Sequence, residues 1–221
     1  MRAHVVRVVI SLAAPSGVSV LLLGGATPVG AQVVRGAADS EYATQVIERA
    51  RGTNEFMCEL ALRSIHNRIG GGYWINAPDA AMDQGELLEW ATYQPDSPDA
   101  VPVLSDALSD GDRCVRRVAA RLLGHVRHPR ALEALLDRLR SSDADTRQMA
   151  AIGLGYREDR NAVDALLRAL TDGAARVRAA VAWALGEIED RRAIAALTRA
   201  LQEDPDPTVR RQAARALGQI Y

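Results

Sequence analysis

The sequence predicts an all-α protein, an α-solenoid in which about four to five helix pairs stack into a right-handed superhelix. Three observations predict it. Apolar octets begin at Val101, Leu132, Val163 and Ile194, and these starting positions are evenly spaced. A Leu-Gly pair closes a second apolar stripe after each octet. Aromatic residues make up only 4% of the chain, so Ala, Leu and Val supply the core, which suits closely packed helices.

Each octet places apolar side chains at positions i, i+3 and i+7, which is one face of a helix. The second stripe of the first repeat runs from Val115 through Ala119-Ala120 to Leu123-Gly124. Its small residues predict a helix that lies close to its neighbours. We expect four repeats, at residues 101–131, 132–162, 163–193 and 194–221.

The turns between the two helices of a repeat carry capping signals. Asp112, Asp143 and Asp206 precede three of the second helices, where a carboxylate accepts from free backbone N–H groups. Ala174 takes this position in the third repeat and cannot do so. The glycines after Leu predict left-handed caps at the ends of the same helices.

The order of Asp-rich turn, Val-Arg, Ala-Ala and Leu-Gly resembles the HEAT-like repeat of the phycobilisome (PBS) lyase type. The resemblance covers residues 101–221. It implies the solenoid fold and leaves the function open, since the group includes bilin lyases, deoxyhypusine hydroxylases, DNA-repair proteins and interaction scaffolds. The hydroxylases of the group carry His-Glu pairs, and no His is followed by Glu in this chain.

One arginine recurs at a fixed position in every repeat and is called the ladder arginine here. An anion-binding ladder is one interpretation. We favour a structural role, in which neighbouring repeats pair charges and hold the stacking register. The ladder arginines are Arg116, Arg147, Arg178 and Arg210.

Residues 1–31 have the composition of a signal peptide, with basic residues before a largely apolar stretch and a small-residue cleavage site at Ala31. We expect cleavage there and export to a periplasmic or extracellular space, with no stable membrane span left afterwards. An uncleaved N-terminal membrane anchor is the alternative.

Residues 32–100 predict a helical cap. Met57–Ile65 align with Val115–Leu123 as a degenerate repeat, and Gly70–Gly72 open a loop that carries Tyr73 and Trp74. These aromatics either cover the first helix pair or anchor a partner.

Export would place the two cysteines, Cys58 and Cys114, in an oxidising space where a disulfide persists. The sequence leaves the disulfide and two free thiols open.

Residues outside the apolar stripe of the second helices share one face and predict a partner-binding surface, with Ile152 and Trp183 at an apolar centre. If Trp183 is at the surface, Trp183→Ala should leave unfolding nearly intact; the alternative is that Trp183 packs on a neighbouring repeat. The candidate residues are Arg117, Arg121, Gln148, Ile152, Trp183, Arg211 and Arg215, joined by Tyr73 and Trp74 of the loop.

The chain has no set of residues typical of a catalytic, metal or cofactor site, and a net charge of −1 gives no general attraction for nucleic acid. We therefore expect a monomeric, non-enzymatic scaffold that binds a protein or peptide, without cofactor. The alternative is a lyase-like or chaperone-like accessory protein that holds a small ligand or chromophore in the solenoid groove.

Overall fold

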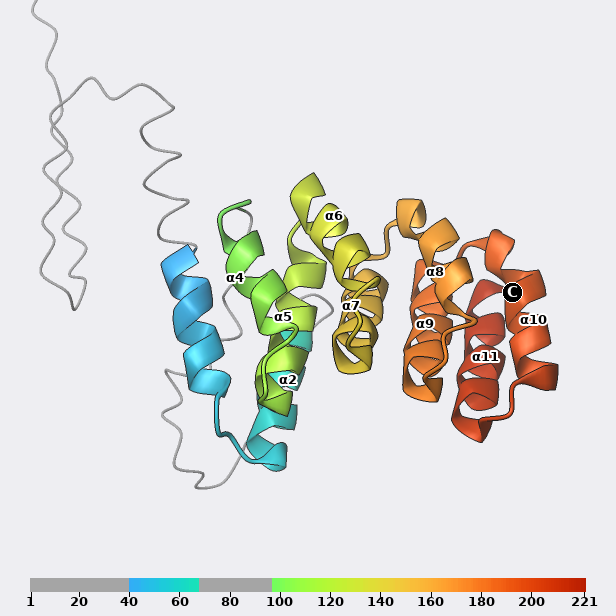
Figure 1. Ribbon diagram of the computed structural model, residues 1–221, viewed down its shortest axis with the longest axis horizontal. Helices are drawn as coiled ribbons and strands as arrows, with labels where there is room; N and C mark the ends of the chain where they lie inside the picture. The colour runs from blue at the N-terminus through green and yellow to red at the C-terminus, as the bar shows by residue number, and fades with distance from the viewer. Residues whose placement is uncertain (1–39, 68–96) are drawn as a thin grey trace, which may run out of the picture.

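The computed structural model describes residues 40–67 and 97–221, and everything below on structure concerns these residues. They form two layers of helices arranged as a row of pairs (Figure 1). The first helices, called A helices here, are α4 (Ala100–Ala107), α6 (Pro129–Arg138), α8 (Val163–Ala169) and α10 (Ile194–Glu203). The second, called B helices, are α5 (Arg113–His125), α7 (Ala144–Arg157), α9 (Ala175–Ile188) and α11 (Pro207–Ile220). The predicted α-solenoid is confirmed.

A further pair precedes the first repeat. A helix over residues 40–50 is followed by α2 (Glu55–Asn67), which lies beside α5 and so extends the B layer. The predicted signal peptide at 1–31 and the Gly-rich loop lie outside the described residues. The proposed domain boundaries therefore stay predictions.

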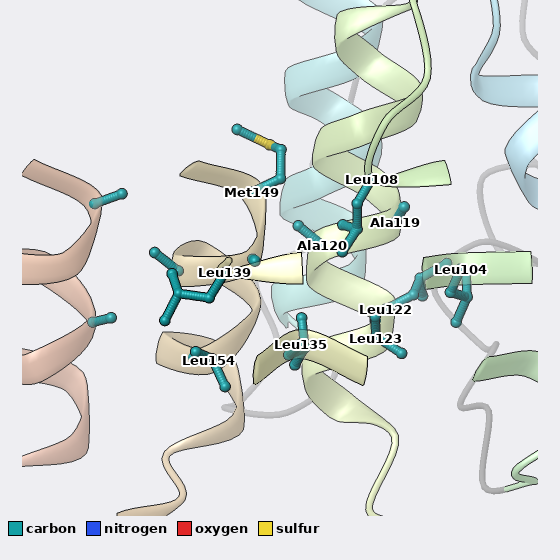
Figure 2. Close-up of a cluster of buried hydrophobic side chains, with 14 of the residues drawn as sticks. Leu104, Leu108, Ala119, Ala120, Leu122, Leu123, Leu135, Leu139, Met149 and Leu154 are labelled. Atoms are coloured by element: carbon teal, nitrogen blue, oxygen red, sulfur yellow. The ribbon is translucent and has the colours of Figure 1, made fainter. Parts of the chain in front are cut away.

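The core lies between the two layers and continues from one repeat to the next. Leu104, Leu123, Leu135 and Leu154 come from four consecutive helices and are fully buried (Figure 2). Alanines from the B helices fill the space between these leucines. The core therefore joins each repeat to its neighbours, as a solenoid requires.

The capping prediction is confirmed at the three B helices that begin with Asp. Asp112 accepts from the backbone N–H groups of Cys114 and Val115, while Asp143 and Asp206 each accept from one backbone N–H. Ala174 has the same extended backbone before α9 but makes no side-chain cap. Two short 3-10 turns, η1 (Arg160–Ala162) and η2 (Arg191–Ala193), lead into α8 and α10.

The prediction that glycine caps each B helix is wrong. α7 and α9 continue past their glycines, and their left-handed residues are Glu158 and Glu189, with φ of 54° and 55°. Gly124, Gly155 and Gly186 instead lie where B helices cross. A Cβ at Gly186 would come within 2.8 Å of Ala216 Cα in α11. Glycine at this position therefore allows neighbouring repeats to approach closely.

Candidate partner-binding face

The ladder arginines all hold the turn that precedes their own helix. In each, Nη1 donates to the backbone carbonyls five and six residues earlier. For Arg147 these are the carbonyls of Ser142 and Ser141, both at 2.9 Å. Because the carbonyls of a turn have no helical partners, this bond fixes the A–B turn of the repeat.

Two ladder arginines also bind the following repeat. Nε and Nη2 of Arg147 donate to Asp172 at 2.7 and 3.0 Å, and Arg178 binds Asp204 at 2.7 and 2.8 Å. The partner is therefore the first Asp of the next A–B turn, not the capping Asp four residues before the arginine. The hydrogen bond from Arg147 lowers the pKa of Asp172, and Arg178 does the same for Asp204, against the opposing effect of burial.

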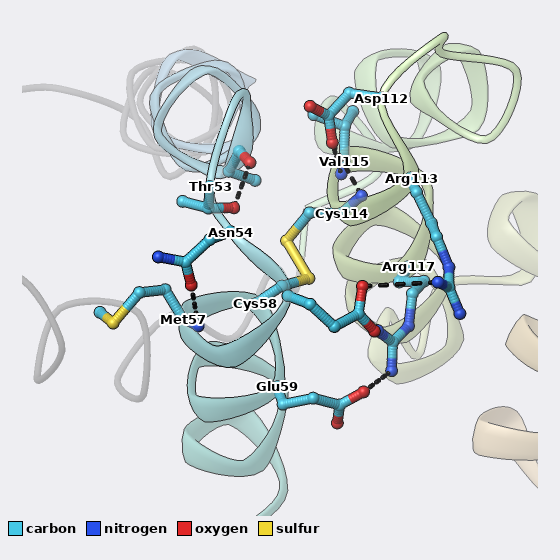
Figure 3. Close-up of a disulfide and its surroundings, with 12 residues drawn as sticks. Thr53, Asn54, Met57, Cys58, Glu59, Asp112, Arg113, Cys114, Val115 and Arg117 are labelled. Carbon is cyan, nitrogen blue, oxygen red and sulfur yellow. Dashed lines mark hydrogen bonds and ion pairs between the residues drawn. A yellow bond between two sulfur atoms is a disulfide. The ribbon is translucent and has the colours of Figure 1, made fainter.

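At the joint between α2 and α5 a disulfide and an ion pair from a different arginine together replace the ladder pair. Cys58 occupies the register of the ladder arginine and is bonded to Cys114 (Figure 3). Arg51, from the turn before α2, donates to both carboxylate oxygens of Asp110 at 3.0 and 2.8 Å. Arg116 has Ser141 at the corresponding place in the next turn, and its nearest carboxylate is Asp145 at 3.9 Å.

Two arginines of the candidate face are engaged within the chain. Arg117 forms ion pairs with Glu55 and Glu59 of α2, the former at 3.1 Å (Figure 3). Arg121 is buried, with 6% of its surface exposed, and its guanidinium lies 4.2 Å from the centre of the Tyr156 ring. Burial lowers the pKa of Arg121. The expected open rim of four arginines is therefore reduced to Arg211 and Arg215, which are exposed.

Tyr156 is the centre of this face and was missed by the sequence analysis. Its ring lies edge-on to Trp183 with centroids 5.1 Å apart, and 5.8 Å from the ring of His125. The three rings come from α7, α9 and α5, so the row crosses three repeats. The residue after each glycine recurs in the same register, and that recurrence was the available signal. The residues are His125, Tyr156, Glu187 and Gln219.

Trp183 packs on the neighbouring repeat, as one of the two interpretations expected. A Cβ at Gly155 would lie 2.5 Å from Cζ3 of its ring, so the indole fills the space that the glycine leaves. The side chain is half-buried. Trp183→Ala is therefore expected to reduce stability by opening a cavity. Gln148 and Ile152 are also half-buried and keep part of their surface open.

Tyr73 and Trp74 lie outside the described residues. Within residues 40–67 and 97–221, no group of three or more His, Cys, Asp or Glu side chains could hold a metal ion. None of the helices in the same ranges is both long and apolar enough to span a membrane.

The sequence pattern of HEAT repeats matches residues 84–152 and 133–218, which together make up more than half of the chain. The chain belongs to the HEAT repeat family. This confirms the resemblance on which the sequence analysis relied. No curated protein matches the chain.

Several solved structures are similar to this HEAT repeat protein. The complex of CpcE and CpcF of phycocyanin lyase from Nostoc sp. PCC7120 is 27% identical over 67% of this chain and 68% of that one, with a TM-score of 0.46. Human deoxyhypusine hydroxylase with glycerol is 25% identical over 86% and 66%, with a TM-score of 0.47. An engineered protein is 23% identical over 80% and 78%, with a TM-score of 0.41. The expected non-catalytic role stays a prediction.

Proposed function

We propose that this HEAT repeat protein is an exported scaffold that captures a protein or peptide partner on the face formed by its B helices. The observation that carries the proposal is the aromatic row of His125, Tyr156 and Trp183, bordered by half-buried Ile152. Aromatic anchors with a polar border are typical of protein interfaces.

The packing of the two layers supports the choice of the B face. The B helices touch at glycines, whereas the A helices leave open grooves of about 240 and 430 Å³ between them. A stack that is closer on one side than on the other curves toward the closer side. The B helices would then line the inner surface, where a partner gains contacts from several repeats at once.

Positive charge at the α11 end of this face would set the orientation in which a partner binds. Arg211 and Arg215 are exposed, and Arg215 lies 3.9 Å from Glu187 Oε1, a distance too long for a strong pair. Both can therefore turn toward a carboxylate of a partner. We expect the partner to bring an apolar segment to the aromatic row and acidic residues to α11.

The Cys58–Cys114 disulfide supports export. Disulfides persist in extracytoplasmic spaces and are rare in reducing ones. Mass analysis of protein expressed from the full chain tests this part. A mature N-terminus at Gln32 together with an oxidised cysteine pair supports export, and a retained N-terminus with free thiols contradicts it.

Affinity capture from the extracytoplasmic fraction tests the binding face. We expect the wild type to retain a stoichiometric protein that Arg211→Glu/Arg215→Glu loses. Arg191→Glu is the matched control, because Arg191 is exposed in η2 on the other layer. Equal capture by both variants would contradict the B face. A coloured or co-purifying small molecule in place of a protein would favour the accessory-protein alternative.

A further inference from the structure

The A layer of the described helices has three successive grooves, and the chain fills only one of them. The first groove lies between α4 and α6, the second between α6 and α8, and the third between α8 and α10. Arg138 of α6 occupies the first groove. Its Nε donates to Ser105 Oγ at 3.0 Å, and Nη2 donates to Asp106 at 2.5 Å. Its remaining nitrogen donates to Ser109 Oγ at 3.3 Å.

The same register carries small and apolar residues in the next two repeats. Ala169 and Ala200 stand where Arg138 stands, one and two repeats further along the chain. Leu136 and Leu167 stand where Ser105 stands. The second and third grooves therefore lack a side chain like that of Arg138. In each of them a leucine also replaces Ser105, which accepts from Arg138 in the first groove. The second groove is open by about 240 Å³ and the third by about 430 Å³.

The floors of both open grooves are apolar. Leu139 and Ala165 complete the floor of the second groove, and Leu170 and Ala196 that of the third. A leucine-sized side chain entering either groove would remove apolar surface from water on both sides. A guanidinium like that of Arg138 would find no counterpart of Ser105 in either groove, and Asp137, in the register of Asp106, would be its one equivalent acceptor at the second groove.

The rims of the open grooves are positively charged. Arg140, Arg168 and Arg199 line them and are exposed, against one exposed acid, Glu203. The other charged lining residues are Asp172, Asp204 and Arg178. Asp172 is bound by Arg147, and Arg178 binds Asp204. An occupant that carries acidic residues beside its apolar ones would complement this rim.

The spacing of the grooves selects a backbone conformation. Directly packed helices lie about 8–10 Å apart, and the more open A helices lie at the upper end of this range or beyond it, so adjacent grooves recur after about 10 Å. A polyproline II chain rises about 3.1 Å per residue with three residues per turn, which brings every third side chain to the same side after about 9 Å. In a β-strand, side chains three residues apart point to opposite sides. A polyproline II segment crossing the A helices would therefore reach both grooves with side chains i and i+3.

We propose that the second and third grooves bind an acidic, proline-rich segment of a partner protein in polyproline II conformation, with apolar side chains three residues apart in adjacent grooves. This site uses the A layer, and so it is separate from the B face proposed above. Filling of the first groove by Arg138 limits the segment to the α6–α10 end of the array.

The test uses a fluorescent peptide of four Glu-Pro-Leu triplets and the full mature chain, with fluorescence anisotropy as the readout. We expect saturable binding that weakens as salt is added. Replacing the leucines by serine, or the glutamates by lysine, should each reduce affinity by about tenfold or more, because burial or charge pairing is lost. These peptide controls leave the protein unchanged.

Two protein variants separate shape from charge. Ala169→Arg/Ala200→Arg refills both grooves and should weaken peptide binding by about tenfold, even though the added charge attracts the peptide. Gln202→Arg adds the same kind of charge at an exposed position of α10 outside the groove lining and should bind as well as the wild type. Thermal melts verify that each variant folds.

Arg211→Glu/Arg215→Glu, which tests the B face, should leave this peptide affinity unchanged. Absence of saturable binding by the wild type would overturn the proposal. Equal affinity of the refilled variant, or of the serine peptide, would overturn it as well.

Discussion

Asp172 joins two repeats at one carboxylate: Arg147 of α7 donates to both of its oxygens, at 2.7 and 3.0 Å, while Oδ1 also accepts from the backbone N–H of Ala174 at 2.8 Å. One side chain thus shapes its own turn and holds the preceding B helix. The Arg178–Asp204 pair has the same geometry one repeat later, where Oδ1 accepts from the N–H of Asp206.

We expect Asp172→Asn to lower the free energy of unfolding by about 1 kcal/mol. The amide keeps the turn-shaping oxygen but loses the charge that pairs with Arg147, and partly buried pairs of this kind contribute on that order. Urea denaturation measures the change. Asp137→Asn at an exposed position of α6 is the control and should stay close to the wild type. Equal destabilisation by the two would remove any special role for the inter-repeat pair.

Stability should fall in acid because the arginine partners lower the pKa values of Asp110, Asp172 and Asp204 below the usual 3.8. A depressed carboxylate pKa contributes stability above the unfolded-state value and loses it as pH falls through the folded-state value. The melting temperature should therefore hold down to about pH 5 and decline below about pH 4. The gap between wild type and Asp172→Asn should narrow over the same acid range. A constant gap would contradict this origin.

The glycines of the B helices allow a comparison at one register. Gly186→Ala places a Cβ 2.8 Å from Ala216 Cα and should cost about 1–3 kcal/mol, because backbone must move. Gly218 has nothing within 4 Å of the same position, so Gly218→Ala should be neutral or stabilise by about 0.5 kcal/mol. Thermal unfolding of both variants decides. A similar change in both would mean that helix propensity, not close approach, governs these positions.

Ala174→Asp should stabilise the protein by about 0.5–2 kcal/mol. The backbone before α9 already has the extended conformation of the capped helices but offers no side-chain acceptor. Calorimetry measures the gain. Asp206→Ala is the reciprocal variant, since it removes the bond to the N–H of Thr208 at 2.7 Å and should cost a similar amount. A loss of stability in Ala174→Asp would contradict the capping argument.

Reduction of the Cys58–Cys114 disulfide should cost at most about 4 kcal/mol, because the bond closes a loop between residues 56 apart in sequence. The loss should be local, since each repeat contacts only its neighbours. Hydrogen exchange followed by mass spectrometry should rise in residues 40–67 and stay unchanged in α9. Uniform exchange across all helices would contradict a local effect. Cys58→Ser/Cys114→Ser should reproduce the reduced protein.

The local features of this fold could be predicted from the sequence. The helix pairs follow from apolar spacing, and the caps at Asp112, Asp143 and Asp206 follow because each acceptor lies within three residues of its donor. Glycine was misinterpreted because Leu-Gly at a helix end has the same pattern as Leu-Gly at a helix crossing. Only the position of the next helix distinguishes the two.

Contacts between repeats could not be predicted in the same way. Arg147 has two candidate aspartates, Asp143 in its own turn and Asp172 in the next, and stacking decides between them. The burial of Arg121 against Tyr156 depends on the same stacking. A residue that follows the repeat pattern thus gains its role from a neighbour one full repeat away, which is why part of the predicted face proved to be internal packing.

From the difference between the two layers we expect the array to bend more easily by changing the spacing of its A helices than by changing that of its B helices. The glycine crossings leave the B layer no room to compress, as the contacts at Gly155 and Gly186 require, whereas the grooves of the A layer can narrow or widen. The array would then bend about the closely packed B layer. A partner that straightens or tightens this layer would change the width of the grooves between the A helices. Binding at the B face would therefore alter the shape of the A layer.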